Sequence, residues 1–212
     1  MADYTDQGTE GDIIKSQSEF AVLTKDASNV PTWKGTLKYL RSGEGYMLHH
    51  QGTNRIQFSY PMYTSSSRYS TFTHQAPLFD NHTGSSMNMI ATVEGVELSQ
   101  GDQLVAYMGA EKVGVAEVDE DGRFFLNVSH GSIGQVTFAV EREGDIVAVA
   151  PTSVAYIADA VMGTFGEPTV INFIATDDIK GSGWYNIQGI KLSRRPTQSG
   201  VYIYNGKPVV IK

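Results

Sequence analysis

The sequence predicts an all-β protein made of two β modules, the second a sandwich, with a C-terminal β-hairpin tail. Three observations support this class. Short runs rich in β-branched and aromatic residues recur along the chain, each bounded by Gly, Asn, Asp, Ser or Pro. Their turns return about every eight to twelve residues, the spacing typical of sandwiches and barrels. Helix signals are confined to two short pieces, 12–17 and 157–162.

The expected strands follow the same pattern from one end of the chain to the other. In chain order they are 20–23, 33–39, 45–49, 56–60, 87–93, 103–108, 112–118, 123–128, 135–140, 146–149, 153–156 and 169–174. A polar stretch rich in Ser and Thr, 63–85, shows no sustained alternation and is expected to be a linker. The expected units are therefore an N-terminal β module at 1–62, a sandwich at 86–175 and a tail at 183–212.

The chain ends in GVYIYNGKPVVIK, which is expected to form a complete hairpin. Asn205-Gly206 favours a two-residue turn because both positions must tolerate φ > 0. The pairs set by this turn are Tyr204 with Lys207, Ile203 with Pro208, Tyr202 with Val209, and Val201 with Val210. Neither face is polar, so both are expected to pack, and Pro208 is expected on an edge strand. The segment 184–192 should supply a neighbouring strand, and the tail should dock on the sandwich.

Composition limits the partners. The chain has 212 residues, of which 41% are hydrophobic and 18% charged, as in a globular protein. The net charge of −7 argues against nucleic acid or an anionic membrane as a partner. There is no cysteine, which excludes disulfides and thiolate zinc sites. No apolar run is long enough to span a bilayer, so no membrane insertion is expected. The start, MADYTDQGTEGD, lacks a signal-peptide profile and is interpreted as a linker.

The sequence offers no catalytic constellation. His49 and His50 are adjacent in an expected strand, so they point to opposite faces. No nucleophile elbow, paired metal-binding histidines or phosphate-cradling glycine loop occurs. The stretch 119–122, DEDG, is either a plain hairpin turn or a cation site, although the distal glutamate of a calcium loop is missing. We expect no enzyme activity, no cofactor and no tightly bound metal.

Aromatic residues are the candidate ligand-binding groups. Sugar rings pack their apolar faces on flat aromatic side chains, while nearby carboxylates or amides satisfy the hydroxyls. The candidates are Trp33, Tyr46, Trp184, Tyr185, Tyr202 and Tyr204. The alternative is that these side chains form the cores and contacts of small β modules, which depend on large aromatics for burial.

Parts of the chain resemble modules of large secreted proteins of the Bacteroidetes type. The first is WKGTLKYLRSGEGYMLHH (33–50) with IQFSYP (56–61), which is similar to a repeat with a Gly-x-Gly-Tyr-Met turn. The second is MNMIATVEGVEL…GDQLVAYMGAEKVGVAEV (87–118), which resembles a following immunoglobulin-like domain. The last 29 residues, WYNIQGIKLSRRPTQSGVYIYNGKPVVIK, resemble a C-terminal sorting-like tail.

The resemblance implies an extracellular or cell-surface location, an immunoglobulin-like second module and a non-catalytic role. In that family a Trp-rich strand usually precedes the segment at Gly11, and here it is missing. The chain is therefore expected to be a C-terminal fragment, cut inside its first module, with upstream domains in the parent protein.

Two functional classes follow. In the first, the chain is a structural or adhesive part of a surface or secreted protein, and its partners are host or cell-surface proteins. The tail then serves as a cap or as a handle for export or attachment. In the second, the chain is a glycan-binding accessory module. Exposed, coplanar aromatic side chains would favour glycan binding, and buried ones the structural role.

Overall fold

Strands make up nearly all the regular structure. The computed structural model describes residues 7–26, 28–41, 44–53, 86–130, 132–179 and 182–212. Within those ranges every regular element is a β-strand except one 3₁₀ turn, η1 (Thr176–Asp178). The all-β prediction is confirmed. The expected strand 56–60 and the expected linker 63–85 lie outside the described residues.

The N-terminal sheet has four antiparallel strands in the order β3-β2-β1-β4. Their bounds are β1 (Ile13–Lys15), β2 (Phe20–Lys25), β3 (Pro31–Gly35) and β4 (Met47–His49). The helix expected at 12–17 is wrong, because residues 13–15 are buried and pair with strands on both sides. The strand expected at 33–39 ends at Gly35, whose φ is 139°. A Cβ there would lie 2.4 Å from the Phe20 carbonyl oxygen, so only glycine fits this approach.

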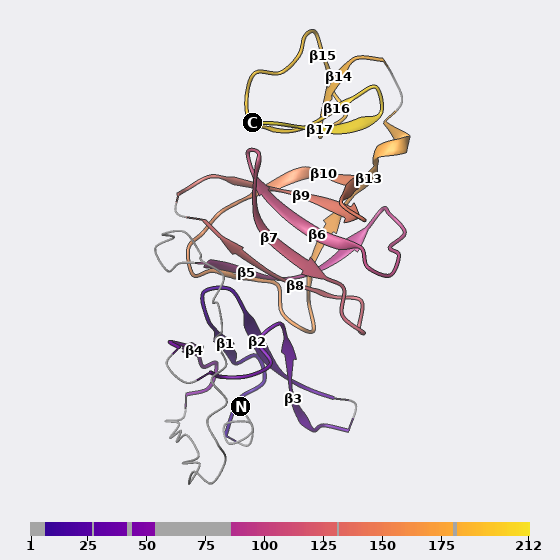
Figure 1. Ribbon diagram of the computed structural model, residues 1–212. Coiled ribbons are helices and arrows are strands. Elements are labelled where there is room, and N and C mark those ends of the chain that lie inside the picture. The colour runs from indigo at the N-terminus through magenta and orange to yellow at the C-terminus, as the bar shows by residue number, and fades with distance from the viewer. Residues whose placement is uncertain (1–6, 27, 42–43, 54–85, 131, 180–181) are drawn as a thin grey trace, which may run out of the picture.

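Two sheets form the central sandwich (Figure 1). The larger has the order β13-β10-β9-β6-β7, and in the smaller β5 pairs with β8, β11 and β12. The strands of the larger sheet are β6 (Gln103–Met108), β7 (Glu111–Glu117), β9 (Gln135–Arg142), β10 (Asp145–Ala155) and β13 (Ile174–Ala175). Those of the smaller are β5 (Ser86–Glu94), β8 (Phe124–Ser129), β11 (Val161–Met162) and β12 (Thr169–Asn172). These strands confirm the sandwich as a fold class, and its immunoglobulin-like topology stays a prediction.

Three expected boundaries in the sandwich differ from the structure. β10 is one strand where two were expected, since a register shift between Val149 and Ser153 accommodates the interruption. The helix expected at 157–162 is wrong, because the chain turns with Asp159 at φ 62° and then pairs as β11 with β5. The strand expected at 169–174 is divided at Phe173. β12 pairs with β5 and β13 pairs with β10, so the chain crosses from one sheet to the other there.

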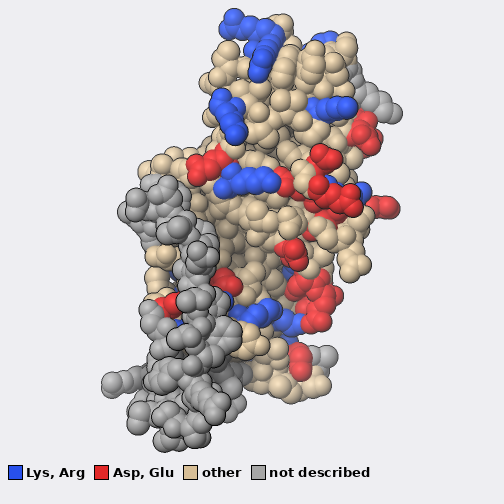
Figure 2. All heavy atoms as spheres, viewed as in Figure 1, with Lys and Arg blue, Asp and Glu red and all other residues tan. Residues whose placement is uncertain are grey.

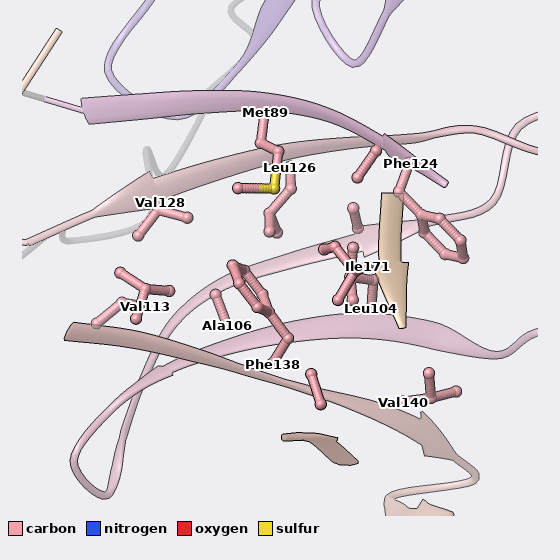
Figure 3. Close-up of a cluster of buried hydrophobic side chains, with 14 of the residues drawn as sticks. Met89, Leu104, Ala106, Val113, Phe124, Leu126, Val128, Phe138, Val140 and Ile171 are labelled. Atoms are coloured by element: carbon pink, nitrogen blue, oxygen red, sulfur yellow. The ribbon is translucent and has the colours of Figure 1, made fainter. Parts of the chain in front are cut away.

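The sandwich core is formed by alternate residues of the facing strands. Met89 and Leu126 of the smaller sheet point toward Phe138 and Leu104 of the larger (Figure 3). All four side chains are buried. This alternation is what two antiparallel sheets packed face to face require.

On the central strands β5 and β6 the residues between these core positions are also buried, whereas Val115 of β7 and Val170 of β12 are exposed. On β5, Ile90 points away from the sandwich core and belongs to a second cluster with the N-terminal sheet. On β6, Val105 and Tyr107 belong to a third cluster with the C-terminal residues. The N-terminal sheet therefore covers one outer face of the sandwich, and the C-terminal sheet covers the other (Figure 1).

The contact with the N-terminal sheet combines an aromatic pair with ion pairs. Phe20 and Phe125 have ring centroids 5.7 Å apart at an interplanar angle of 56°. Beside them the Lys15 ammonium lies 2.8 Å from the Asp159 carboxylate. The Lys34 ammonium lies 2.7 Å from the Glu120 carboxylate, in the turn between β7 and β8. Apolar burial therefore contributes most to this contact, because ion pairs with an exposed partner add little.

Tyr107, which belongs to the contact with the C-terminal sheet, is also part of a polar network. Tyr107 donates a hydrogen bond to the buried Glu141 carboxylate, which also lies 2.6 Å from the Lys112 ammonium. Burial, followed by this hydrogen bond to Glu141, raises the pKa of the Tyr107 hydroxyl. The hydroxyl therefore stays protonated and remains a donor at neutral pH.

An ion pair between a buried carboxylate and a partly exposed arginine lies at the end of the sandwich and predicts a pH dependence. The wholly buried Asp102 carboxylate accepts hydrogen bonds from Arg142 at 2.9 and 2.8 Å and from the Ser99 amide at 2.8 Å. The Arg142 guanidinium lowers the pKa of the Asp102 carboxyl. The ionised Asp102 carboxylate therefore stabilises the folded state fully above the pKa of an unfolded aspartate, about 3.9. This stabilisation is lost as the pH falls through the lower pKa of Asp102 in the folded state.

We expect Asp102→Asn to destabilise the chain at neutral pH and to flatten the acid side of its stability profile. Urea unfolding between about pH 2 and pH 7 measures this, and the difference from wild type should shrink below about pH 4. Asp145→Asn, at an exposed position, is the control. A constant difference between wild type and Asp102→Asn at every pH would contradict the assignment.

Candidate functional site

The hairpin of the C-terminal sheet adopts the pairing that its sequence predicts, whereas residues 184–192, expected to supply one strand, form two that pair with each other. β14 (Trp184–Asn186), β15 (Lys191–Leu192), β16 (Gly200–Tyr204) and β17 (Lys207–Ile211) lie in the order β15-β14-β16-β17. All four residue pairs expected for the hairpin are present. The turn residues Asn205 and Gly206 have φ values of 51° and 75°, and β17, with Pro208, is an edge strand.

The two faces of this sheet have different surroundings. Val201 and Ile203 are buried on the inner face, where Tyr185 packs against the same cluster on the sandwich. The docking expected for the tail is confirmed. The register places Trp184, Tyr202 and Tyr204 on the outer face. The expectation that both faces pack is confirmed only in part there, because Ile211 is buried on this face but Tyr204 is 42% exposed.

An aromatic pair occupies the outer face. The rings of Trp184 and Tyr204 have centroids 4.6 Å apart and are inclined by 32°. The Arg195 guanidinium lies over the Trp184 ring, 5.9 Å from its centroid. Lys207 pairs with Tyr204 in the hairpin and so shares the same face. The arrangement is a half-exposed aromatic surface with two cationic side chains at its edge.

A cleft of about 610 Å³ adjoins this surface. Its wall on the C-terminal side is the loop 193–199 between β15 and β16, together with Asn186 and Tyr202. Its other wall is the sandwich, through residues such as Gln135 and Thr137. The turn of β6 and β7 closes one end, where a Cβ on Gly109 would lie 2.8 Å from the Ser199 hydroxyl. Tyr202 and Arg195 connect the cleft to the aromatic surface.

Charge is unevenly distributed along the chain. Residues 183–212 contain five of the 16 Lys and Arg residues and none of the 23 Asp and Glu residues. Figure 2 shows Lys and Arg gathered over the C-terminal sheet, and Asp and Glu along the sandwich beside it. The C-terminal sheet is therefore positively charged, although the net charge of the whole chain is negative.

The remaining two aromatic candidates lie elsewhere. Trp33 and Tyr46 pack against the buried Leu37 on the N-terminal sheet. The Tyr46 hydroxyl accepts a hydrogen bond from the Arg41 amide at 2.7 Å and donates one to Glu44 at 2.8 Å. This packing favours a role in the core of the N-terminal module. Because the sandwich lies between them and the C-terminal sheet, the six candidates do not form one site (Figure 1).

Histidines and carboxylates are dispersed in the described residues. His50 Nδ1 lies 2.9 Å from the buried Asp12 carboxylate, while His49 contacts the Gln51 side chain. His74 and His82 are outside the described residues. The stretch 119–122 forms a hairpin turn, in which Asp119 accepts hydrogen bonds from two backbone amides. In the described part of the chain, no three His, Cys, Asp or Glu side chains converge as a metal site would require.

Sequence reasoning identified the aromatics of this site but missed its cations. Arg194, Arg195 and Lys207 were not among the candidates, because the net charge of the chain was considered as a whole. Counting charges for the tail alone would have revealed them, since acidic residues are absent from 183–212.

No protein-family model matches the chain, and no curated protein or solved structure matches it either. Over the part of the chain that the structure describes, no helix is long and apolar enough to cross a membrane.

Proposed function

We propose that the chain is a non-catalytic structural or adhesive part of an extracellular or cell-surface protein, with the C-terminal sheet as its cap. The observation that carries the proposal is the presence of a buried apolar contact on each outer face of the sandwich. Clusters containing Phe20 and Phe125 on one side, and Val105 and Ile203 on the other, join three β units into one stack. Close-packed apolar contacts resist compression, which suits a structural role.

The C-terminal sheet suits the role of a cap. Its inner face covers apolar side chains of β6, β9 and β10, which would otherwise be exposed on the sandwich. Its edge strand β17 carries Pro208, which lacks an amide hydrogen and so opposes the addition of a further strand. The outer face of the sheet remains available as a handle for export or attachment.

The resemblance to secreted Bacteroidetes-type modules supports the location and the immunoglobulin-like character of the sandwich. In this proposal the partners are host or cell-surface proteins, as well as upstream domains of the parent chain.

A second candidate function is glycan binding, and the outer face of the C-terminal sheet favours it. Trp184 and Tyr204 present a partly exposed aromatic surface beside a cleft lined by amide and hydroxyl side chains such as Asn186 and Gln198. Aromatic faces and convergent polar groups are what a sugar ring requires.

Calorimetry tests whether the three β units unfold together, and retention on cell surfaces tests the adhesive role. We expect one unfolding transition whose calorimetric and van't Hoff enthalpies agree, because the apolar contacts couple the three units. A fluorescently labelled chain should remain on cell surfaces after washing, with heat-unfolded chain as the control. Separate transitions for the three units, combined with no retention on any surface, would contradict the proposal.

A further inference from the structure

The positive charge of the C-terminal sheet is not neutralised within the described residues. Arg194 and Arg195 are exposed, and neither makes an ion pair there. No acidic residue within 183–212 is available to pair with them. Arginine is well suited to oxyanions, because its guanidinium presents a fork of N–H donors to two oxygens of a carboxylate or sulfate.

Aromatic and cationic groups occupy the same face. Arg195 lies over Trp184, which contacts Tyr204, and Lys207 stands beside Tyr204 in the hairpin. A ring-shaped ligand stacked on Tyr204 would therefore have a cation on either side of it. Arg195 also lines the 610 Å³ cleft together with Arg194, so the cationic surface continues from the aromatic pair into the cleft.

We propose that this surface binds acidic glycans, meaning sugar chains that carry carboxylate or sulfate groups. The inference rests on the proposed glycan-binding function and specifies its ligand class. Tyr204 stacks a sugar ring, and Trp184 packs against the Tyr204 ring. Arg194 and Arg195 bind the acidic groups of neighbouring sugars, and the cleft side chains of Gln198 and Thr197 hydrogen-bond hydroxyls.

Charge spacing favours an acidic glycan over other polyanions. A nucleic acid carries a charge on every nucleotide, and a long strand would extend from this small sheet onto the acidic sandwich. An anionic membrane would need exposed aliphatic side chains projecting around the cations, whereas on the outer face Val209 is half-buried and Ile211 is buried. An acidic glycan can place uncharged sugars between its charged ones and fits a compact positive surface.

Titration calorimetry with defined polymers tests the proposal on the full chain. The probes are polygalacturonate and chondroitin sulfate as acidic glycans, dextran as a neutral glycan, and duplex DNA and phosphatidylglycerol vesicles as other polyanions. We expect binding to an acidic glycan that exceeds binding to dextran, DNA and vesicles. The affinity should fall as sodium chloride rises from about 50 to 500 mM.

Variants locate the site. Arg194→Gln/Arg195→Gln should weaken binding of the acidic glycan by about tenfold or more, since each arginine donates charge-assisted hydrogen bonds. Tyr204→Ala should weaken it as well through loss of stacking. Lys25→Gln/Lys38→Gln removes the same charge from exposed positions on the N-terminal module and should change affinity by less than about twofold. Thermal unfolding of each variant verifies that the sheet remains folded.

Each contrary result has a distinct meaning. Equal binding to dextran and to acidic glycans would overturn the inference while leaving glycan binding in place. Equal binding to DNA or vesicles, or equal loss in the Lys25→Gln/Lys38→Gln control, would reduce it to general attraction of polyanions and overturn it. Absence of binding to every glycan would reject both the inference and the glycan-binding function, and would leave the structural role untouched.

Discussion

Deleting residues 183–212 is expected to lower the melting temperature of the chain and to expose a dye-binding hydrophobic face. The reason is that Val105, Tyr107 and Val149 would lose the layer that keeps them from water. Full burial stabilises each such side chain by roughly 1.5–3 kcal/mol before conformational entropy is subtracted. Differential scanning calorimetry and the fluorescence of a hydrophobic dye measure the two effects.

A point variant tests the apolar contact between the C-terminal sheet and the sandwich while the tail is still present. Ile203 is fully buried, so Ile203→Ala should cost about 2–5 kcal/mol of unfolding free energy. Val210, which is 37% exposed in the same hairpin, is the control, and Val210→Ala should cost no more than about 0.5 kcal/mol. The capping role is excluded if the truncated chain melts like the full chain and the tail amides exchange as fast as in an unfolded peptide.

Phe20→Ala is expected to produce the second large loss of stability, of about 3–5 kcal/mol. Phe20 is fully buried, and its ring meets Phe125 of the sandwich. In a double-mutant cycle with Phe125→Ala, we expect a coupling of about 0.5–1.5 kcal/mol, because the rings contact each other across the two units. Urea unfolding followed by circular dichroism provides these free energies.

Tyr39→Ala is the aromatic control, since its side chain is 77% exposed and its loss should change the free energy by no more than about 0.5 kcal/mol. Strictly additive effects of Phe20→Ala and Phe125→Ala would show that the two rings do not stabilise each other. A separate early transition in Phe20→Ala, with the sandwich unchanged, would show that the N-terminal sheet unfolds on its own.

The elements that sequence reasoning located well are those set by local chemistry. β6 (Gln103–Met108) has the bounds expected for it, and the hairpin has its expected register. The two expected helices failed for a different reason. Ile13–Lys15 and Val161–Met162 are too short to show the hydrophobic periodicity that distinguishes a strand from a helix. Pairing with neighbouring strands decided their conformation.

The candidate site was predictable only in part. Three of its aromatics, Trp184, Tyr202 and Tyr204, were candidates, but so was Tyr185, which points to the opposite face. The alternation of side chains along a strand predicts which residues share a face. It does not predict which of the two faces packs against another sheet.

The sequence by itself determined the all-β class, the Asn205-Gly206 turn and the pairing of the last two strands, because turn chemistry and a period of two are local properties. Only the tertiary structure decided what covers each face. Val105 and Ile90 lie on outer faces of the sandwich, and they are buried because other sheets pack there. The meeting of Trp184 with Arg195 likewise depends on the path of a loop. Such contacts join residues distant in sequence, and no local pattern encodes which of them will meet.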